Sequence, residues 1–227
     1  DREKEIINFE PQEYWKIDAI SEIDKKSELM KLEFYGNREG KLALANESEV
    51  NSVLENVKDH DGTVVEVEKK KKLRNPYPPF ITSSLQQEAS NRFGFTTKKT
   101  MIIAQQLYEG IAIKGHGTVG LITYMRTDST RTSEVAKEAC RAFIVEKYGE
   151  ALLIKEEKKQ KASKNSQDAH EAIRPTMIEL TPSEIDDALN KDQLKLYDLI
   201  WSRFVASQMA SAEFESHSIE VEIGDYR

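Results

Sequence analysis

The sequence has little of what disulfides, membrane spans and zinc sites require. Cys140 is the one cysteine among 227 residues, which excludes an intramolecular disulfide and a cysteine-rich zinc site. No apolar run approaches the roughly 20 residues that a membrane helix needs. The four histidines include no His-x-His or His-Glu-x-x-His pair. These absences favour a protein of the cytoplasm, without membrane contact and without a metal site built from its own residues.

The chain also lacks an excess of positive charge, since 40 Asp and Glu outnumber 33 Lys and Arg and the net charge is −7. The charge is unevenly distributed, however, with −4 over residues 1–78, +4 over residues 79–176 and −7 over residues 177–227. Phosphate binding depends on local charge more than on the total. The middle of the chain therefore keeps nucleic acid open as a partner, although scattered surface lysines explain the same numbers.

The hydrophobic pattern predicts two kinds of segment. Alternating apolar residues predict strands near 14–20, 29–35, 63–68 and 214–223, whereas apolar residues at helical spacing predict helices at 83–93, 97–109, 133–148, 166–173 and 191–209. Strand-forming flanks thus enclose a mostly helical block. Asn37 to Gly40 predicts a turn, the glycines at 115, 117 and 120 predict a loop, and Thr181-Pro182 predicts the start of a further helix. In the helix at 133–148 we expect Val135, Ala139, Phe143 and Ile144 to face inward. We expect an α+β protein, in which a helical domain of residues 79–210 is inserted into a β-containing domain of residues 1–78 and 211–227.

Two local signals refine this picture. Asn46 followed by Glu49 predicts a capped helix with Val50, Val53, Leu54 and Val57 in its apolar stripe. The four lysines at 69–72, followed by prolines at 76, 78 and 79, indicate a linker between the two domains. A solvated edge explains the lysine run better than a DNA contact does.

The densest group of polar residues is Thr123-Tyr124-Met125-Arg126-Thr127-Asp128-Ser129. In an extended chain, alternate residues share a face, so Tyr124 and Arg126 would lie side by side, followed by Asp128. A phenolate can attack phosphorus while a guanidinium neutralises the phosphate oxygens. The phenol, with an ordinary pKa near 10, needs help from cations or a base. A packed strand tyrosine beside a surface ion pair is the alternative reading.

Two further groups could contact phosphate. If residues 166–173 are helical, His170 and Arg174 lie one turn apart and could both donate to a phosphate, although a lone histidine is more often structural. Hydroxyls at the helix start near residue 83 could bind an anion, with Gln86 and Ser90 facing a nucleic-acid strand. For this second group we favour a plain capped helix.

Three stretches together resemble the bacterial DNA topoisomerase I family of type IA topoisomerases. They are Pro79-Phe80-Ile81-Thr82-Ser83-Ser84-Leu85-Gln86-Gln87, Gly120-Leu121-Ile122-Thr123-Tyr124-Met125-Arg126-Thr127-Asp128-Ser129 and Ser166-Gln167-Asp168-Ala169-His170-Glu171-Ala172-Ile173-Arg174-Pro175-Thr176. The tyrosine motif is the most specific, because the related topoisomerase III tends to carry proline in place of Met125. The resemblance extends over nearly the entire chain.

The resemblance implies a role for each candidate residue. Tyr124 would be the nucleophile that cuts one DNA strand and stays joined to its 5′ phosphate, and Arg126 would hold the scissile phosphate. His170 would contact DNA near that phosphate, with Arg174 a weaker candidate beside it. Thr123 and Asp128 match the motif and would also contact DNA, in roles that the resemblance defines less closely.

The resemblance also implies what surrounds these residues. The helical domain would be a gate, flanked by part of a β-rich arch, in a monomer that acts on the single-stranded part of negatively supercoiled DNA. The family's acidic Mg²⁺-binding domain and its zinc modules are not recognisable in these 227 residues. We therefore expect Mg²⁺ to be bound elsewhere in the full-length enzyme, and we expect this segment alone not to relax DNA.

Two alternatives remain open from the residues themselves. A tyrosine recombinase or a rolling-circle nickase also uses tyrosine on phosphorus, but the first needs several dispersed arginines and histidines and the second a His-x-His pair. A non-catalytic DNA-binding helical module, in which Tyr124 is only structural, is the other alternative.

Overall fold

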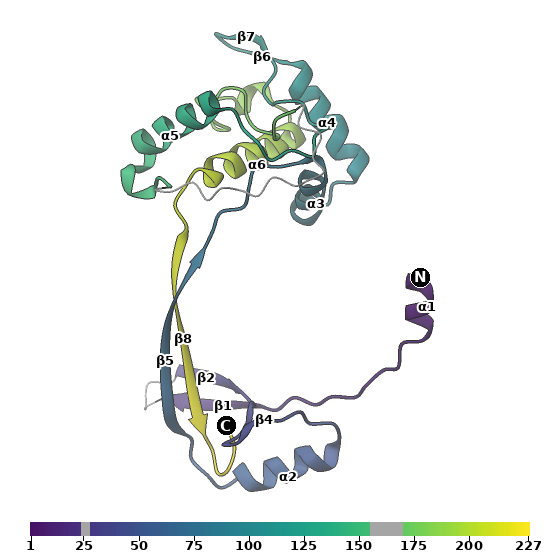
Figure 1. The fold of residues 1–227 in the computed structure, drawn as a ribbon, viewed down its shortest axis with the longest axis vertical. Helices are drawn as coiled ribbons and strands as arrows, with labels where there is room; N and C mark the ends of the chain where they lie inside the picture. Colours follow the sequence, from purple (N-terminus) through teal and green to yellow (C-terminus); the bar gives the residue numbers. More distant parts are fainter. Residues whose placement is uncertain (24–27, 155–169) are drawn as a thin grey trace. The chain divides into compact units, whose positions relative to one another are not determined.

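The computed structural model describes residues 1–23, 28–154 and 170–227 (Figure 1). The chain divides into two compact units, one of residues 1–72 with 215–227 and the other of residues 73–214. The domain boundaries predicted from the sequence, after residues 78 and 210, differ by a few residues from these unit boundaries after residues 72 and 214. Both units mix helices with strands, as an α+β chain requires.

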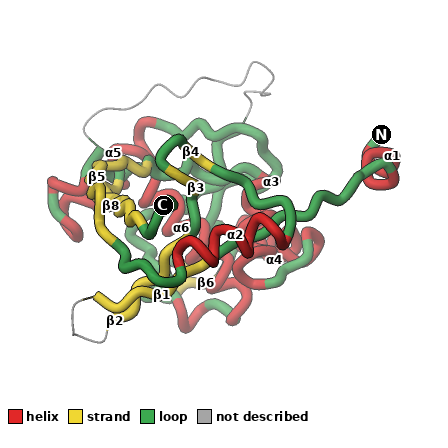
Figure 2. Tube along the Cα trace, turned by 90° about the horizontal axis from the view of Figure 1, so that it is seen from below, coloured by secondary structure: helices red, strands yellow, loops and turns green. Residues whose placement is uncertain are grey.

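The first unit contains a β-hairpin and two very short strands. β1 (Asp18–Ile23) and β2 (Glu28–Glu33) pair antiparallel, and they run side by side in Figure 2. Ala19 lies opposite Leu32, on the half-buried face predicted from alternation. The strand begins later than predicted, because Trp15 makes only an isolated bridge to Leu44. β3 (Gly36–Asn37) and β4 (Gly40–Lys41) form the expected turn, and α1 (Arg2–Ile7) precedes them all.

The helix α2 (Glu47–Val57) confirms the predicted cap. The side-chain oxygen of Asn46 accepts a hydrogen bond from the backbone amide of Glu49 at 3.0 Å. The side-chain NH₂ group of Asn46 in turn donates to the Glu49 carboxylate at 2.9 Å. Val50 and Val53 are buried in the small core of this unit. Leu54 is 43% exposed, so its predicted place in the stripe is wrong.

The longest strands are β5 (Thr63–Arg74) and β8 (Ala212–Glu222), which pair in a two-stranded ribbon (Figure 1). The lysines at 69–72 lie inside β5, so their assignment to a linker is wrong. All side chains of β5 are exposed, and a solvated strand keeps its backbone hydrogen bonds while its lysines stay in water. The charge run therefore did not mark the end of the strand.

Four helices form the core of the second unit. They are α3 (Thr82–Phe93), α4 (Thr97–Glu109), α5 (Glu134–Tyr148) and α6 (Lys191–Ser207), with 3-10 turns η1 (Glu150–Leu152) and η2 (Asp186–Ala188). α6 packs against α3 and α4 (Figure 1). It buries seven side chains, Tyr197, Ile200 and Phe204 among them, as its predicted apolar stripe requires.

Several predictions for the second unit are wrong in detail. Val135 is 77% exposed and Ala139 is also exposed, whereas Cys140 and Ile144 carry the core contact of α5. α5 has apolar residues on more than one side, so the sequence alone did not fix its inward face. The glycine-rich stretch after α4 is a hairpin of β6 (Ile111–Ile113) and β7 (Gly117–Val119), not a loop. After Thr181 the chain forms turns and η2, not an α-helix.

In the part of the chain that the structure describes, none of the helices has both the length and the apolar composition to cross a bilayer.

Alkaline pH is expected to destabilise the helical unit through two buried groups. Burial raises the pKa of the Cys140 thiol from 9.0 to about 12, and burial also raises the pKa of Tyr197, whose hydroxyl donates to the Leu180 carbonyl at 2.6 Å. Above pH 9.0 the unfolded thiol loses its proton while the folded thiol keeps it. The unfolded state then binds fewer protons, so stability falls as pH rises.

Urea unfolding from about pH 8 to about pH 11 would measure this decline. Cys140→Ala should flatten part of the profile, since it removes one of the two groups. A free energy of unfolding that stays level across this range would contradict the prediction.

Candidate active site

The ring of Tyr124 lies between two other rings in the helical unit. Its centroid is 5.5 Å from that of Tyr108 in an edge-on arrangement and 5.1 Å from that of His170 in a tilted one. Tyr124 is half-buried, whereas Tyr108 is 40% exposed and His170 is exposed. Residues from three segments of the chain thus meet at the predicted nucleophile, and His170, which the resemblance places near the same phosphate, is one of them.

Tyr108 was missed in the sequence, although a signal for it exists. The β6–β7 hairpin returns the chain to the end of α4, where the Leu121 amide donates to the Leu107 carbonyl at 2.7 Å. A Cβ atom at Gly120 would lie 2.6 Å from the Tyr108 carbonyl oxygen, so only glycine permits this approach. Gly120 therefore brings Tyr108 and Tyr124 together.

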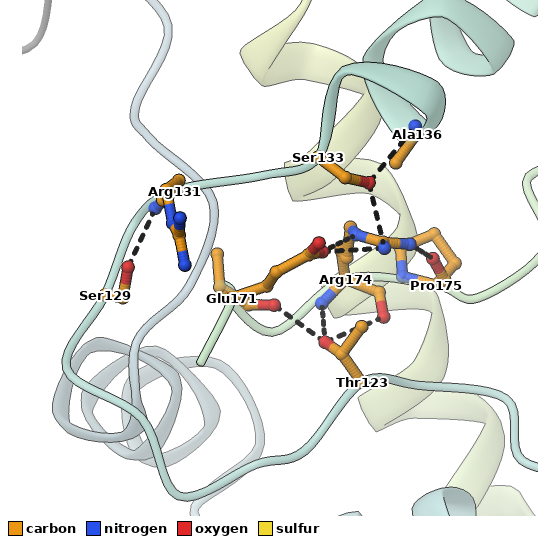
Figure 3. A network of polar contacts seen from close by, with 9 residues as sticks. Thr123, Ser129, Arg131, Ser133, Ala136, Glu171, Arg174 and Pro175 are labelled. Carbon is orange, nitrogen blue, oxygen red and sulfur yellow. Dashed lines mark hydrogen bonds and ion pairs between the residues drawn. The ribbon is translucent and has the colours of Figure 1, made fainter. Parts of the chain in front are cut away.

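The segment before Tyr124 is fastened to residues 172–175. Ile122 bridges to Pro175, and the Thr123 amide donates to the Arg174 carbonyl at 3.0 Å. The Thr123 hydroxyl donates to the Ala172 carbonyl at 2.7 Å and accepts from the Arg174 amide at 3.0 Å (Figure 3). This hydroxyl was predicted to contact DNA, but in the structure it joins two chain segments.

The chain bends immediately after Tyr124. The bend falls at Met125 and Arg126, so the extended geometry that predicted Tyr124 and Arg126 side by side does not hold. Beyond the bend, burial alternates: Arg126 and Asp128 are exposed, while Thr127 and Ser129 are buried. Arg126, within the bend, and Asp128, two residues after it, are thus both exposed.

Arg174 does not lie on a helix with His170, contrary to the prediction. Residues 170–173 are not helical, because Ile173 pairs with Phe80 as an isolated bridge; residues 166–169 of that predicted helix lie outside the described residues. The side chain of Arg174 is 13% exposed, and its guanidinium pairs with the Glu171 carboxylate at 2.7 Å. It also donates to the Pro175 carbonyl and to the Ser133 hydroxyl (Figure 3). Arg174 therefore stabilises the backbone around His170 instead of presenting its donors to solvent.

The start of α3 differs from the predicted anion site. The helix begins at Thr82, and the Ser84 hydroxyl accepts a hydrogen bond from the Ile81 amide at 3.0 Å, so neither Ser83 nor Ser84 is the N-cap residue. Two of the helix-start hydroxyls, those of Thr82 and Ser84, are bonded within the protein. Further along, Gln86 is half-buried and Ser90 is exposed one turn later.

A magnesium site is not formed by the described residues. Over 1–23, 28–154 and 170–227, no three His, Cys, Asp or Glu side chains are grouped to hold a metal ion. One Asp-x-Asp spacing exists, Asp59-His60-Asp61, in the exposed turn after α2. It belongs to the first unit, and Tyr124 belongs to the second.

Comparison with known proteins identifies the family of the chain. A family model described as DNA topoisomerase matches residues 1–227. The solved structure of full-length topoisomerase I from Thermotoga maritima is similar to the chain with 38% sequence identity and a TM-score of 0.74. The match covers 100% of this chain and 35% of the Thermotoga chain. The chain carrying Tyr124 and its aromatic neighbours therefore belongs to the type IA DNA topoisomerase family.

Proposed function

We propose that the protein containing this chain cuts and rejoins one DNA strand through a covalent bond to Tyr124. The observation that carries the proposal is the placement of Tyr124: its ring packs against those of Tyr108 and His170, and the exposed Arg126 follows two residues later in the chain. Family membership supports DNA as the substrate. The chain spans about a third of the Thermotoga topoisomerase, so the activity proposed is that of a whole enzyme.

The chemical step is a transesterification at phosphorus. The phenol oxygen of Tyr124 loses its proton and bonds to a backbone phosphorus; the bond from that phosphorus to the 3′ oxygen breaks, and the leaving oxygen takes up a proton. Arg126 would neutralise charge on the phosphate oxygens, and His170 would contact the DNA beside it. The reverse reaction restores the DNA and needs no ATP, because the phosphotyrosine bond conserves the energy of the broken one.

Strand passage would follow from this step. With the cut strand tethered through its 5′ phosphate, the other strand can pass the break before resealing, which relaxes negative supercoils. We place this reaction in a cytoplasmic monomer, with any Mg²⁺ bound outside the described residues. We also propose that residues 1–227 by themselves do not relax plasmid DNA.

Peptide mapping of a trapped adduct tests the nucleophile. The whole enzyme is denatured during reaction with a single-stranded oligonucleotide and digested with trypsin. Cleavage after Lys114 and Arg126 releases a peptide in which Tyr124 is the only tyrosine, while Tyr108 falls in the preceding peptide. We expect the nucleotide mass on the Tyr124 peptide. A nucleotide on any other peptide contradicts the proposal.

The end label on the oligonucleotide tests the polarity and the alternative function. A 3′ label should remain with the protein and a 5′ label should leave on a shortened strand, because the linkage is to the 5′ phosphate. A non-catalytic DNA-binding module would bind the oligonucleotide and yield no adduct with either label.

A further inference from the structure

The hydroxyl of Thr82, at the start of α3, contacts the backbone on both sides of Arg126. It lies 2.8 Å from the Met125 carbonyl and 3.0 Å from the Thr127 carbonyl, and it accepts a hydrogen bond from the Thr127 amide at 2.9 Å. The Thr82 amide donates to the Thr127 carbonyl at 2.9 Å. One side chain thus reaches both residues that flank Arg126 in the sequence.

Three chain segments near Tyr124 are joined to one another by hydrogen bonds. The segment of Tyr124 is bonded to residues 172–174 through Thr123, and it is bonded to the start of α3 through Thr82. The second and third of these segments are also bonded to each other, because the Ile173 amide donates to the Phe80 carbonyl, just before α3, at 2.8 Å. The chain is therefore held on both sides of Tyr124: before it, Thr123 is bonded to residues 172–174, and after it, Met125 and Thr127 are bonded to the Thr82 side chain.

The bend itself explains why a hydroxyl is needed there. At Met125 and Arg126 the chain leaves its pairing with residues 173–175, so these backbone groups need other partners. From a single atom, the Thr82 hydroxyl supplies a donor to the Met125 carbonyl and an acceptor to the Thr127 amide, on the two sides of Arg126. The chain continues this pattern beyond the bend, since the Ser129 amide donates to the Thr127 hydroxyl at 3.1 Å.

We propose that Thr82 is a positioning residue for strand cleavage: its hydroxyl fixes the bend that sets Arg126 relative to Tyr124. The inference rests on the proposed function. Loss of the hydroxyl should leave DNA binding nearly intact and slow the covalent step, because misplacement of about 1 Å can lower a rate by about 100-fold.

The test compares three variants of the whole enzyme in single-turnover cleavage of a labelled oligonucleotide at saturating concentration. Thr82→Val keeps the shape and removes the hydroxyl, so we expect adduct formation to slow by about 10- to 100-fold with Kd changed by less than about twofold. Thr82→Ser keeps the hydroxyl and should restore most of the rate. If Thr82→Val does not fold, Thr82→Ala takes its place, and cleavage by all variants is then measured at a lower temperature.

Thr100→Val is the matched control. Thr100 is fully buried, and its hydroxyl donates to the Thr96 carbonyl at 3.0 Å within the first turns of α4. This control should lower the melting temperature without slowing cleavage. The inference is overturned if Thr82→Val cleaves at the wild-type rate, or if Thr100→Val slows cleavage equally. A wild-type enzyme that forms no tyrosine adduct would instead overturn the proposed function.

Discussion

Tyr124→Phe is expected to abolish the covalent DNA adduct and the relaxation activity of the whole enzyme. The phenylalanine ring can keep the contacts with Tyr108 and His170, so the change removes one oxygen atom from an unaltered aromatic group. Loss of a nucleophile lowers turnover by at least about 10³-fold in enzymes where it has been removed. Denaturing gels with labelled oligonucleotide measure the adduct, and gel shift at fixed salt measures DNA binding, which should persist.

Tyr108→Phe is the matched control for this loss. Its ring also contacts Tyr124, and the substitution again removes a single phenol oxygen. The control should form the adduct at close to the wild-type rate. If Tyr108→Phe loses the adduct and Tyr124→Phe retains it, the nucleophile is Tyr108 and the assignment from the motif is wrong.

The features that were predicted correctly from the sequence are local ones. The cap formed by Asn46 and Glu49 depends on residues three positions apart, and the buried stripe of α6 depends on a period that repeats along one helix. Such features are visible in a short window of sequence. They define single helices, but they do not position Arg126 or Thr82.

The features that were missed depend on pairing between distant segments. Residues 170–173 have a composition that suits a helix, yet Ile173 pairs with Phe80 and Pro175 pairs with Ile122, so tertiary contacts decide their conformation. The same pairing redirects Arg174 from an expected phosphate contact to Glu171. Nothing in the spacing of Thr82 indicates that its hydroxyl reaches a segment more than 40 residues away.

The candidate nucleophile and its histidine were nevertheless predicted together, for a different reason. The sequence places them in two motifs separated by 46 positions, and only the family resemblance linked those motifs before the ring contact between Tyr124 and His170 was seen. Tyr108 was given no role from the sequence. Its place beside Tyr124 depends on a hairpin and on the close approach at Gly120, which a linear pattern does not contain.

Arg126→Ala is expected to slow adduct formation by about 10²- to 10³-fold at saturating DNA, the loss typical of removing one donor to a developing charge. The backbone of its two neighbours is held by Thr82, so the substitution should remove the guanidinium and leave the bend in place. Arg126→Lys should recover only part of the rate, because an ammonium group keeps the charge but lacks the planar pair of donors that fits a phosphate.

Arg92→Ala separates this effect from a general loss of positive charge. Arg92 is an exposed arginine in the last turn of α3, paired with the Glu88 carboxylate at 2.7 Å, and its removal changes the net charge by the same amount. If Arg126 acts on the scissile phosphate, its loss lowers the cleavage rate even when all enzyme is bound to DNA, while Arg92→Ala does not. If saturating DNA restores the rate of Arg126→Ala, the guanidinium contributes only to binding. Another group must then neutralise the charge on the phosphate that Tyr124 attacks.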